Sequence, residues 1–598
     1  MEEQFRASRV LRFGVFELDL RTGELRKKGF AVKLQEQPFR VLALLLEHPG
    51  ELVTREEIRR KLWPDDVVVE FDQNLNNAVK KLRHALDDPA ETPRFIETLP
   101  RRGYRFIAPV EAATAGPTDF VPRSQRWQRA AVSERLARVK LVVLPFEDLT
   151  GDSQQEYFSE GMTEEMIGQL GRLHAGQLRV IGRATAMKFR TGENDIGRFA
   201  RDWNVEYLLK GSARRSGERV RVTAELIRAQ DQTQLWTRTY DRRLRDILGL
   251  QIEVARAIAR ELPIGAPSTG APEGGDVTRP VNPEAYEAYL KGRYFWTKMT
   301  PEAEQKALGY FQKSIELDPD YAPAHAGLSA AYALLSVLGA VPARESQPKA
   351  GAAARRALEL DDTLPMAHVQ LGFYQLIYEW DFAGAKRSFE RALELDPSSS
   401  AALHAHAHSL VVDGRVDEAI AEMRRAIEAD PLWLYGSSDL GFFLYLSRRY
   451  DDAIAQCNRT LELDPNFPSP HYYLSQIYEV LRRYPEAFRE DQKIMALTGA
   501  LSSFLDPLEE AFSSSGWEGA QRKRLELQLS WQRKEHVPAF YLMRTYLLLG
   551  DKQKALDWLE KACDERHQEV VFLKVSPMFD SLRSDPRFQR LLDRIWET

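Results

Sequence analysis

The chain has 598 residues, of which 43% are hydrophobic and 29% charged, with a formal net charge of −5. This composition is typical of soluble globular protein, and the length excludes a single core and predicts roughly four domains of about 150 residues. Cys457 and Cys563 have neither metal nor redox spacing, so a disulfide framework is not expected and a reducing compartment is favoured. The first residues lack the apolar core of a signal peptide, and no run of about 18 apolar residues predicts a transmembrane helix.

Residues 1–110 begin with short segments in which apolar and polar residues alternate, which is the pattern of strands. They predict a small antiparallel sheet made of residues 13–20, 24–27 and 29–34. A helix is predicted from Gln35 to His48. A second helix follows Thr54, which forms a capping box with Glu57 three residues later.

A helix with two distinct faces is predicted next, between Asp72, which can cap its N-terminus, and Pro89, which cannot continue it. Its apolar stripe recurs at helical spacing and consists of Leu75, Val79, Leu82 and Leu86. Its opposite face carries amides and cations, namely Asn74, Asn77, Lys80, Lys81 and Arg83. Such side chains can reach base edges and phosphates in a major groove.

Two strands, residues 95–99 and 104–107, follow this helix and predict a β-hairpin with Arg101 and Arg102 at its tip. A two-faced helix followed by a basic hairpin is the layout of a winged helix. Residues 1–110 hold 20 Lys and Arg against 18 Asp and Glu. Affinity for DNA should therefore depend on placed contacts more than on the bulk field.

The segment resembles the OmpR/PhoB-type winged-helix DNA-binding domain over roughly residues 10–110. The resemblance lies in the leading strands, the Val-Thr-Arg-Glu-Glu entry to the second helix, the Leu-Trp-Pro turn, the Val-Lys-Lys-Leu-Arg core and the Gly-Tyr-Arg-Phe hairpin. It implies base readout by Gln73, Asn74, Asn77 and Lys81. It implies phosphate contacts by Lys80, Arg83, Thr54, Arg101, Arg102 and Tyr104. It also implies that the loop from Asp65 to Phe71 touches RNA polymerase.

Two differences from the family pattern bear on this interpretation. Relatives often carry arginine early on the recognition helix, where this chain has Gln73 and Asn74, so the target sequence stays open. Many relatives also carry a phosphoacceptor receiver before the winged helix. About ten residues precede the first strand here, so we expect no control by aspartyl phosphorylation within this chain. The cations could instead form a solvated helix face, but the order of strands, capping box, loop and hairpin favours DNA binding.

Residues 111–139 are predicted to form a basic linker. Six cations fall in residues 123–140 against one acid, Glu134, which excludes a membrane span at this point. This part is either a solvated linker helix or a source of extra phosphate contacts, and we favour the first interpretation.

Residues 140–264 follow the order β-α-β-α-β-β-β-α, which predicts a mixed sheet with helices packed on it. The elements are expected at residues 140–146, 155–173, 178–181, 195–203, 206–214, 218–229, 233–240 and 247–262. The block resembles the TolB amino-terminal-like domain in VVLPFEDLTGD, YFSEGMTEEM and QLWTRTYDR. It contains no Walker loop, no G-x-S-x-G and no metal-ligand cluster. Four arginines form either an anion patch or the ordinary outward face of a hairpin, which we favour: Arg214, Arg215, Arg219 and Arg221.

Residues 265–282 are rich in Gly and Pro and predict a flexible linker, after which residues 283–598 repeat. Phrases such as ALELDP and TLELDP place Asp at positions 318, 361, 396, 430 and 464, at intervals of 43, 35, 34 and 34. A period of 34 is the tetratricopeptide signature of paired helices that pack on their neighbours. The longer first interval predicts a longer inter-helix turn at residues 338–348, and residues 576–596 predict a capping helix.

Histidines and aromatic residues raise two questions in the repeats. His404 and His408 lie one turn apart on a helix face, but two histidines without a carboxylate or thiol in register make a poor metal site. Packing is therefore favoured, and no metal is expected. Six aromatic residues either line the repeat groove or fill the core: Tyr374, Tyr378, Phe442, Phe443, Tyr472 and Tyr473.

The sequence thus predicts a multidomain α+β protein with a winged helix-turn-helix, a mixed α/β sandwich domain and an all-α tetratricopeptide solenoid, without a cofactor. We interpret it as a bacterial-type, cytoplasmic, one-component transcriptional regulator, not an enzyme. Its winged helix would bind double-stranded DNA and its repeat groove a protein or peptide. Two rival hypotheses are a scaffold whose winged helix docks protein, and an enzyme hidden in the middle domain.

Overall fold

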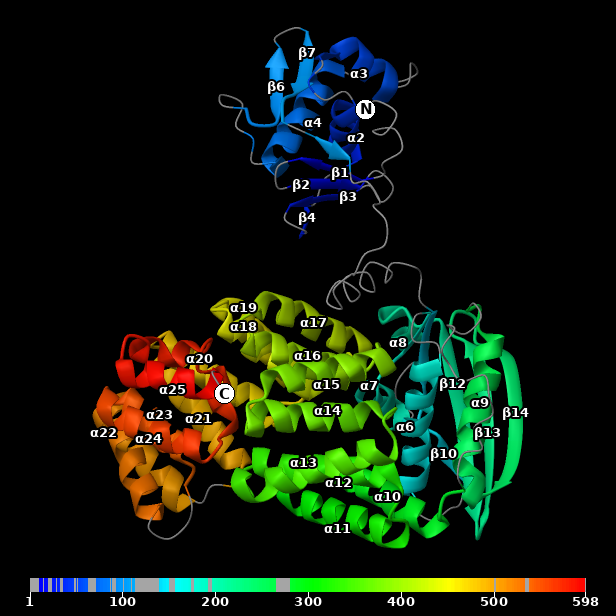
Figure 1. Cartoon of the computed structure of the whole chain (residues 1–598), viewed down its shortest axis with the longest axis vertical. Coiled ribbons are helices and arrows are strands. Elements are labelled where there is room, and N and C mark those ends of the chain that lie inside the picture. Colours follow the sequence, from blue (N-terminus) through cyan, green and yellow to red (C-terminus); the bar gives the residue numbers. More distant parts are fainter. Residues whose placement is uncertain are drawn as a thin grey trace. The chain divides into compact units, whose positions relative to one another are not determined.

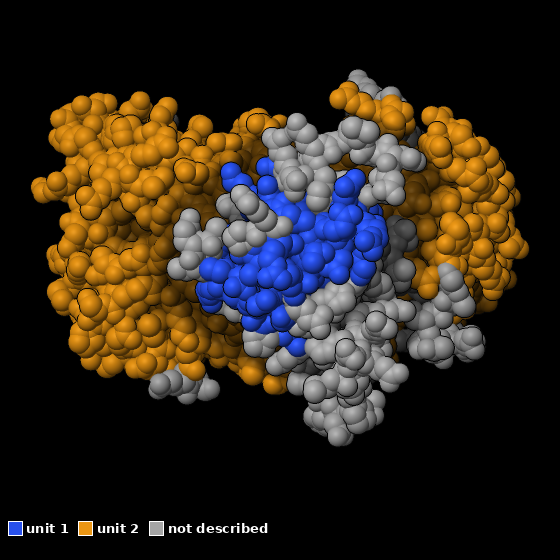
Figure 2. All heavy atoms as spheres, turned by 90° about the horizontal axis from the view of Figure 1, so that it is seen from above, with its two compact units in different colours: residues 1–130 blue, residues 131–598 orange. Residues whose placement is uncertain are grey.

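The computed structural model divides into two compact units, residues 1–130 and 131–598 (Figure 2). It describes residues 10–13, 16–19, 24–27, 30–32, 36–47, 50, 52–62, 71–86, 88, 93–99, 102–108, 110–112, 139–149, 156–173, 177–191, 196–264, 280–499, 502–532 and 537–596. Within these ranges, every helix is too short or too polar to cross a lipid bilayer.

In its described residues, the first unit has two small antiparallel sheets and three helices (Figure 1). The larger sheet has the order β4-β3-β2-β1-β8 and consists of β1 (Val10–Phe13), β2 (Phe16–Asp19), β3 (Glu24–Lys27), β4 (Phe30–Val32) and β8 (Glu111–Ala112). The smaller has the order β5-β7-β6 and consists of β5 (Leu52–Thr54), β6 (Ile96–Leu99) and β7 (Gly103–Phe106). The helices are α2 (Glu36–Glu47), α3 (Arg55–Leu62) and α4 (Phe71–Leu86).

The prediction of one strand over residues 13–20 was wrong. Phe13 ends β1 and Phe16 begins β2, and the two residues pair across an antiparallel ladder. Alternating hydrophobicity continues on both sides of a short reversal, so the periodicity alone cannot reveal it.

The core of this unit lies between α4 and the two sheets. The predicted apolar stripe is confirmed, because Leu75, Val79, Leu82 and Leu86 are all buried. Four rings from both sheets and the hairpin pack together at centroid distances between 5.0 and 6.3 Å: Phe13, Phe16, Phe95 and Phe106. Helix α4 is therefore fixed against the rest of the unit by its own buried face.

The second unit begins with a mixed sheet of order β11-β9-β12-β13-β14, with β10 paired to β12. Its strands are β9 (Val139–Val143), β10 (Glu147–Asp148), β11 (Leu178–Val180), β12 (Tyr207–Ser216), β13 (Arg219–Arg228) and β14 (Thr233–Arg243). Its helices are α6 (Glu156–Leu173), α7 (Arg183–Met187), α8 (Ile196–Asp202) and α9 (Ile247–Glu261), with 3-10 turns η2 (Lys188–Thr191) and η3 (Leu244–Asp246). The sequence prediction missed the short α7 and β10.

Strand β9 is buried on both faces, as its continuous apolar run indicates. Leu141 and Val143 contact the core under α6 and α9, whereas Val142 contacts the opposite core with residues of α7 and α8. Of the four arginines for which an outward hairpin face was favoured over an anion patch, three form ion pairs, since Arg219 and Arg221 bind Asp241, and Arg215 binds Glu287.

Paired helices then stack from residue 283 to the C-terminal region (Figure 1). They are α10 (Pro283–Trp296), α11 (Pro301–Leu317), α12 (Ala322–Val337), α13 (Ala343–Leu360), α14 (Pro365–Tyr374) with the π-helical η4 (Gln375–Glu379), α15 (Phe382–Leu395), α16 (Ser400–Val412), α17 (Val416–Ala429), α18 (Leu434–Leu446), α19 (Tyr450–Leu463), α20 (Pro468–Val480), α21 (Tyr484–Leu497), α22 (Ser502–Trp531), α23 (Ala539–Leu548), α24 (Lys552–Asp564), η5 (Gln568–Phe572), η6 (Pro577–Leu582) and α25 (Pro586–Trp596). The repeated aspartates end α11, α13, α15, α17 and α19.

The inter-helix turn predicted at residues 338–348 is shorter than expected, since α12 ends at Val337 and α13 begins at Ala343. It is still longer than the turn at residues 413–415 between α16 and α17. Helix α13 includes Pro348, so part of the extra length belongs to a helix. Pro348 lies inside the helix, beyond the first turn, so it has no N–H to donate to the carbonyl four residues earlier. Of the six aromatic residues for which groove and core were both open, Tyr374, Phe442 and Phe443 are buried. The other three, Tyr378, Tyr472 and Tyr473, are half-buried.

The sheet and the solenoid share one hydrophobic core. Tyr286 and Leu290 of α10 belong to the same buried cluster as Met162 of α6 and Val254 of α9. The amide of Gln251 in α9 donates a hydrogen bond to the Tyr286 hydroxyl at 2.8 Å. The predicted linker, residues 265–282, lies mostly outside the described residues, but the segments on either side of it pack as one body.

A second contact joins the sheet region to the solenoid at Asp430, the residue that ends α17. Its carboxylate accepts hydrogen bonds from the backbone N–H groups of Ala184 and Thr185, at 3.0 and 2.8 Å, and from the Thr185 hydroxyl at 2.6 Å. The Gly182 N–H donates to the carbonyl of Ala429 at 2.8 Å. The approach is close, because a Cβ on Gly182 would lie 2.5 Å from the Asp430 side chain. The solenoid is therefore attached to the sheet region at two separate places.

Candidate nucleic-acid interface

The polar face of α4 is exposed. Asn76, Asn77, Lys80 and Lys81 are all open to solvent, on the side opposite the buried stripe. Asn77 and Lys81 are four residues apart, so they lie one above the other on the helix surface. The helix thus presents two amides and two cations along one side.

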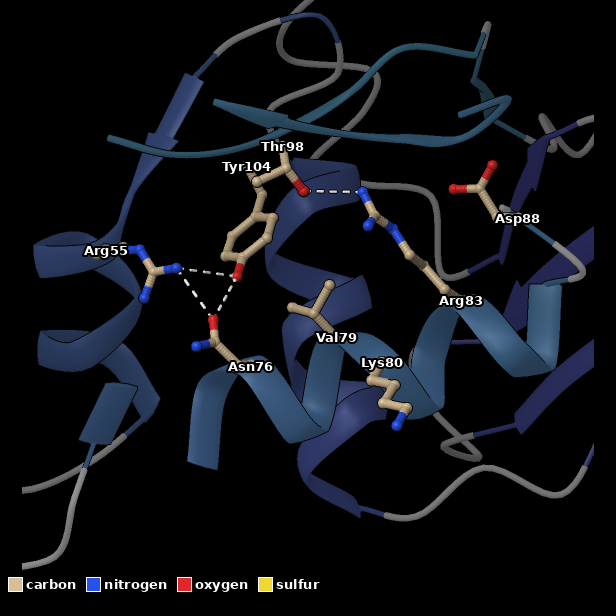
Figure 3. A pocket seen from close by; sticks show the side chains of 8 residues that line it. All are labelled: Arg55, Asn76, Val79, Lys80, Arg83, Asp88, Thr98 and Tyr104. Atoms are coloured by element: carbon tan, nitrogen blue, oxygen red, sulfur yellow. Dashed lines mark hydrogen bonds between the residues drawn. The ribbon is translucent and has the colours of Figure 1, made fainter. Parts of the chain in front are cut away.

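A hollow of about 490 Å³ lies between α4 and the β6–β7 hairpin (Figure 3). It is lined by Arg55, Asn76, Val79, Lys80, Arg83, Asp88, Thr98 and Tyr104. Three of these side chains are cationic, and Figure 3 shows Arg55 and Arg83 on opposite sides of Tyr104. A concave surface with several cations at its rim suits the phosphates of a nucleic-acid backbone.

Arg55, the first residue of α3, connects three elements of this surface. Its guanidinium Nη2 donates to Asn76 Oδ1 at 3.0 Å and to the Tyr104 hydroxyl at 3.3 Å. The Tyr104 hydroxyl in turn donates to Asn76 Oδ1 at 3.0 Å. The three bonds hold the N-terminal half of α4 at a fixed distance from α3 and β7. The sequence prediction did not single out Arg55, although it lies inside the Val-Thr-Arg-Glu-Glu phrase.

The C-terminal half of α4 is tied to the hairpin by Arg83 and Asp88. Arg83 Nη2 donates to the carbonyl oxygen of Ile96 at 2.7 Å and to Thr98 Oγ1 at 2.8 Å. Asp88 is 3% exposed, and its carboxylate accepts the backbone N–H groups of Arg94, Phe95 and Ile96. The hairpin therefore starts at a fixed angle to the helix.

Gly103 is required where β7 crosses β5. A Cβ at this position would lie 2.1 Å from the carbonyl oxygen of Val53 and 2.9 Å from the Thr54 Cα. Both are backbone atoms that cannot rotate away, so another residue would separate the two strands. This explains the glycine of the Gly-Tyr-Arg-Phe phrase without any contact to a ligand.

The residues predicted to contact DNA differ in their exposure and in their hydrogen-bond partners. Asn77, Lys80, Lys81 and Arg102 are exposed, and Arg83 is half-buried against the hairpin. Tyr104 is 3% exposed and its hydroxyl is hydrogen-bonded to Arg55 and Asn76, which gives it a positioning role, and its phosphate contact stays a prediction. The predicted capping box is confirmed, because Thr54 Oγ1 accepts the Glu57 N–H at 3.2 Å. The Gln73 and Asn74 side chains, Arg101 and residues 65–70 lie outside what the structure describes.

Three family models match the chain. Residues 29–106 match the family described as transcriptional regulatory protein, C terminal. Residues 137–254 match the second domain of HilA/YgeH-like transcriptional regulators, and residues 378–441 match a tetratricopeptide repeat. The TolB-like assignment of the middle region stays a prediction.

Two curated relatives match longer stretches. Putative adenylate cyclase 3 of Rhizobium meliloti is 31% identical over 267 residues, which is 44% of each chain. The transcriptional regulator HilA of Salmonella typhimurium is 24% identical over 399 residues, or 67% of this chain and 66% of HilA. The chain therefore spans less than two thirds of the length of either relative. Among solved structures, the DNA-binding domain of Klebsiella pneumoniae RstA in complex with the RstA box is 27% identical, with a TM-score of 0.15, over 16% of this chain and 96% of that domain.

These matches support a DNA-binding transcriptional regulator with a tetratricopeptide region. Two of the three matched models, like HilA, are regulators of transcription. The name of the Rhizobium relative is that of an enzyme, so the expectation that this chain is not an enzyme stays a prediction.

Proposed function

We propose that α4 enters the major groove of duplex DNA while the β6–β7 hairpin contacts the adjacent backbone, and that the solenoid holds a protein partner of the regulator. The observation that carries the proposal is the exposed amide-and-lysine face of α4, with Arg102 exposed at the end of the hairpin. Amides pair with adenine edges, and cations pair with guanine edges and phosphates.

Asn77 and Lys81 are the side chains we assign to base edges. They share one line of the helix, and the opposite line is buried in the core. Lys80 and Arg102 are assigned to phosphates on either side of the groove, because Lys80 lies at the rim of the hollow and Arg102 at the hairpin turn. Asn76 is assigned a backbone contact through its NH₂ group, since its oxygen already accepts hydrogen bonds from Arg55 and Tyr104.

The middle region, in this proposal, mounts the solenoid and performs no catalysis. Its sheet is joined to the solenoid through the core around Tyr286 and again through Asp430. A partner that altered the curvature of the repeats would then displace α7 and α10, the helices at these two contacts. We also propose that the loop from Asp65 to Phe71 contacts RNA polymerase.

Two single substitutions separate base readout from phosphate contact. With Asn77→Ala we expect a change in preference among duplex sequences, worth about 1–3 kcal/mol at one base position, because a bidentate contact is lost. With Lys80→Ala we expect affinity for all duplexes to fall together, and the slope of log K against log salt to become shallower by about 0.9. Selection of bound fragments from a random duplex pool, followed by titration of the enriched sequence, measures both.

Lys313→Ala is the matched control, because Lys313 is an exposed lysine of α11 in the other unit. It should change neither preference nor slope. If Asn77→Ala enriched the same sequences as the unaltered protein, or Lys80→Ala left the slope unchanged, the assigned roles would be wrong.

A further inference from the structure

Three metal-ligating side chains converge between two successive repeats of the solenoid. His404 and His408 lie on α16, and Asp439 lies on α18, one repeat later. His404 Nε2 is 2.7 Å from Asp439 Oδ2, His408 Nε2 is 3.3 Å from the same oxygen, and the two Nε2 atoms are 3.1 Å apart. The sequence showed no carboxylate in register with the two histidines, but Asp439 of the next repeat supplies one.

This triangle has the dimensions of a first-row metal site. Zinc binds imidazole nitrogen and carboxylate oxygen at about 2.0–2.2 Å, so the ligand atoms of a tetrahedral site lie about 3.3 Å apart. Two of the observed edges, 3.1 and 3.3 Å, are close to that value, and the third, at 2.7 Å, is shorter. Two histidines and one carboxylate are also the ligand set of catalytic zinc centres, in which a fourth position stays open.

If Asp439 is ionised, hydrogen bonds alone cannot satisfy the three contacts. A neutral imidazole carries one N–H and one lone pair. If both Nε2 atoms carry hydrogen, both donate to Asp439, but the two N–H groups then face each other at 3.1 Å. If either Nε2 carries the lone pair, that lone pair faces the carboxylate oxygen, at 2.7 or 3.3 Å. A cation at the centre would make all three contacts favourable.

The surroundings fit such a cation. His404 and Asp439 are buried and His408 is half-buried, so the three ligand atoms are largely shielded from competing water. The Tyr473 hydroxyl donates to the other oxygen of Asp439 at 2.7 Å and orients it. Metal ligands are commonly held by outer hydrogen bonds of this kind.

We propose that His404, His408 and Asp439 bind one divalent first-row transition metal ion, of which zinc is the representative, and that the ion links α16 to α18. Phe572 of η5 packs near His408, at a centroid distance of 6.0 Å, and contacts Phe442 of α18 at 5.1 Å. The ion would therefore fix the curvature of the repeats at the point where the C-terminal segment meets them. Aromatic rings around the histidines, including Phe373 and Phe443, limit access of water.

Cobalt and zinc titrations of the full chain, without an affinity tag and freed of metal by a chelator, test the proposal. We expect one Co²⁺ per chain with the strong visible absorption of tetrahedral coordination, displaced by Zn²⁺. His408→Ala and the isosteric Asp439→Asn should each weaken binding by at least about tenfold, and Tyr473→Phe by about 10- to 100-fold. Zinc should raise the melting temperature of the unaltered protein and not that of His408→Ala.

His406→Ala is the matched control. His406 lies on the same helix, between the two ligands, but its Nδ1 contacts Glu422 at 3.2 Å. The His406→Ala variant should bind cobalt as the unaltered protein does. The proposal is overturned if the unaltered protein shows no tetrahedral cobalt spectrum, a result that needs no variant to fold. Equal zinc binding by the unaltered protein, His408→Ala and Asp439→Asn would also overturn it.

Discussion

Replacing Asp88 with alanine should lower the free energy of unfolding of residues 1–130 by about 3–5 kcal/mol, because three amides lose their acceptor together. Asp88 is 3% exposed and accepts the N–H groups of Arg94, Phe95 and Ile96 at the start of the hairpin. A buried donor without a partner costs about 1–3 kcal/mol. Since a domain is stable by about 5–15 kcal/mol in total, much of this unit's stability would be lost.

The effect should be confined to the first unit. Hydrogen exchange of the full chain under increasing denaturant should show α2 and α4 opening early in Asp88→Ala, while α16 exchanges as before. Duplex binding should weaken in proportion to the unfolded fraction. Asp88→Asn keeps one acceptor oxygen, so its stability should lie between that of the unaltered protein and that of Asp88→Ala.

Glu97→Ala is the control, because the Glu97–Arg105 pair is 3.5 Å long and both side chains are 39% exposed. Such an exposed pair contributes less than about 1 kcal/mol. If Asp88→Ala were no more destabilising than Glu97→Ala, the β6–β7 hairpin would not depend on the Asp88 carboxylate. Our explanation of the fixed angle between the hairpin and α4 would then be wrong.

Replacing Asp430 with alanine should release α7 from the solenoid and lower the local opening free energy there by about 3 kcal/mol. Its carboxylate is 4% exposed and accepts two backbone N–H groups and the Thr185 hydroxyl. A loss of this size corresponds to about a hundredfold faster hydrogen exchange at the amides of Ala184 and Thr185. The α6–α10 core should stay protected, because it does not include Asp430.

Asp464→Ala provides the comparison at the equivalent place one repeat later. Asp464 ends α19 as Asp430 ends α17, but its carboxylate accepts the N–H of Asn466 within its own turn. We expect no change in exchange at α7. An equal effect of both substitutions on α7 would mean that Asp430 acts through its helix end and not through the contact with Thr185.

The sequence predicted the features that depend on local periodicity. The stripe from Leu75 to Leu86 and the repeated aspartates follow from helical and 34-residue spacing, and the structure contains both. Four alanines recur at the same 34-residue spacing and are fully buried, namely Ala385, Ala419, Ala453 and Ala487. These patterns depend on the spacing of residues that are close together in the chain.

The features that the sequence did not predict join residues far apart. Asp439 lies 31 and 35 residues from the histidines that it contacts, and Asp430 lies 245 residues from Thr185. The role of Arg55 depends on the distance between α3 and α4, which no spacing encodes. The bonds of Tyr104 to Arg55 and Asn76 were not predicted, because an aromatic residue with a polar tip occurs both at interfaces and in cores.

The most direct test of the account is the salt dependence of duplex binding by the full chain, measured between about 50 and 200 mM salt. If α4 and the hairpin contact DNA phosphates through Lys80 and Arg102, log K should fall linearly with log salt with a slope of about −2 or steeper, at about −0.9 per phosphate contact. Replacing both cations with alanine should flatten that slope. A slope near zero, or the same slope in the double variant, would contradict the account.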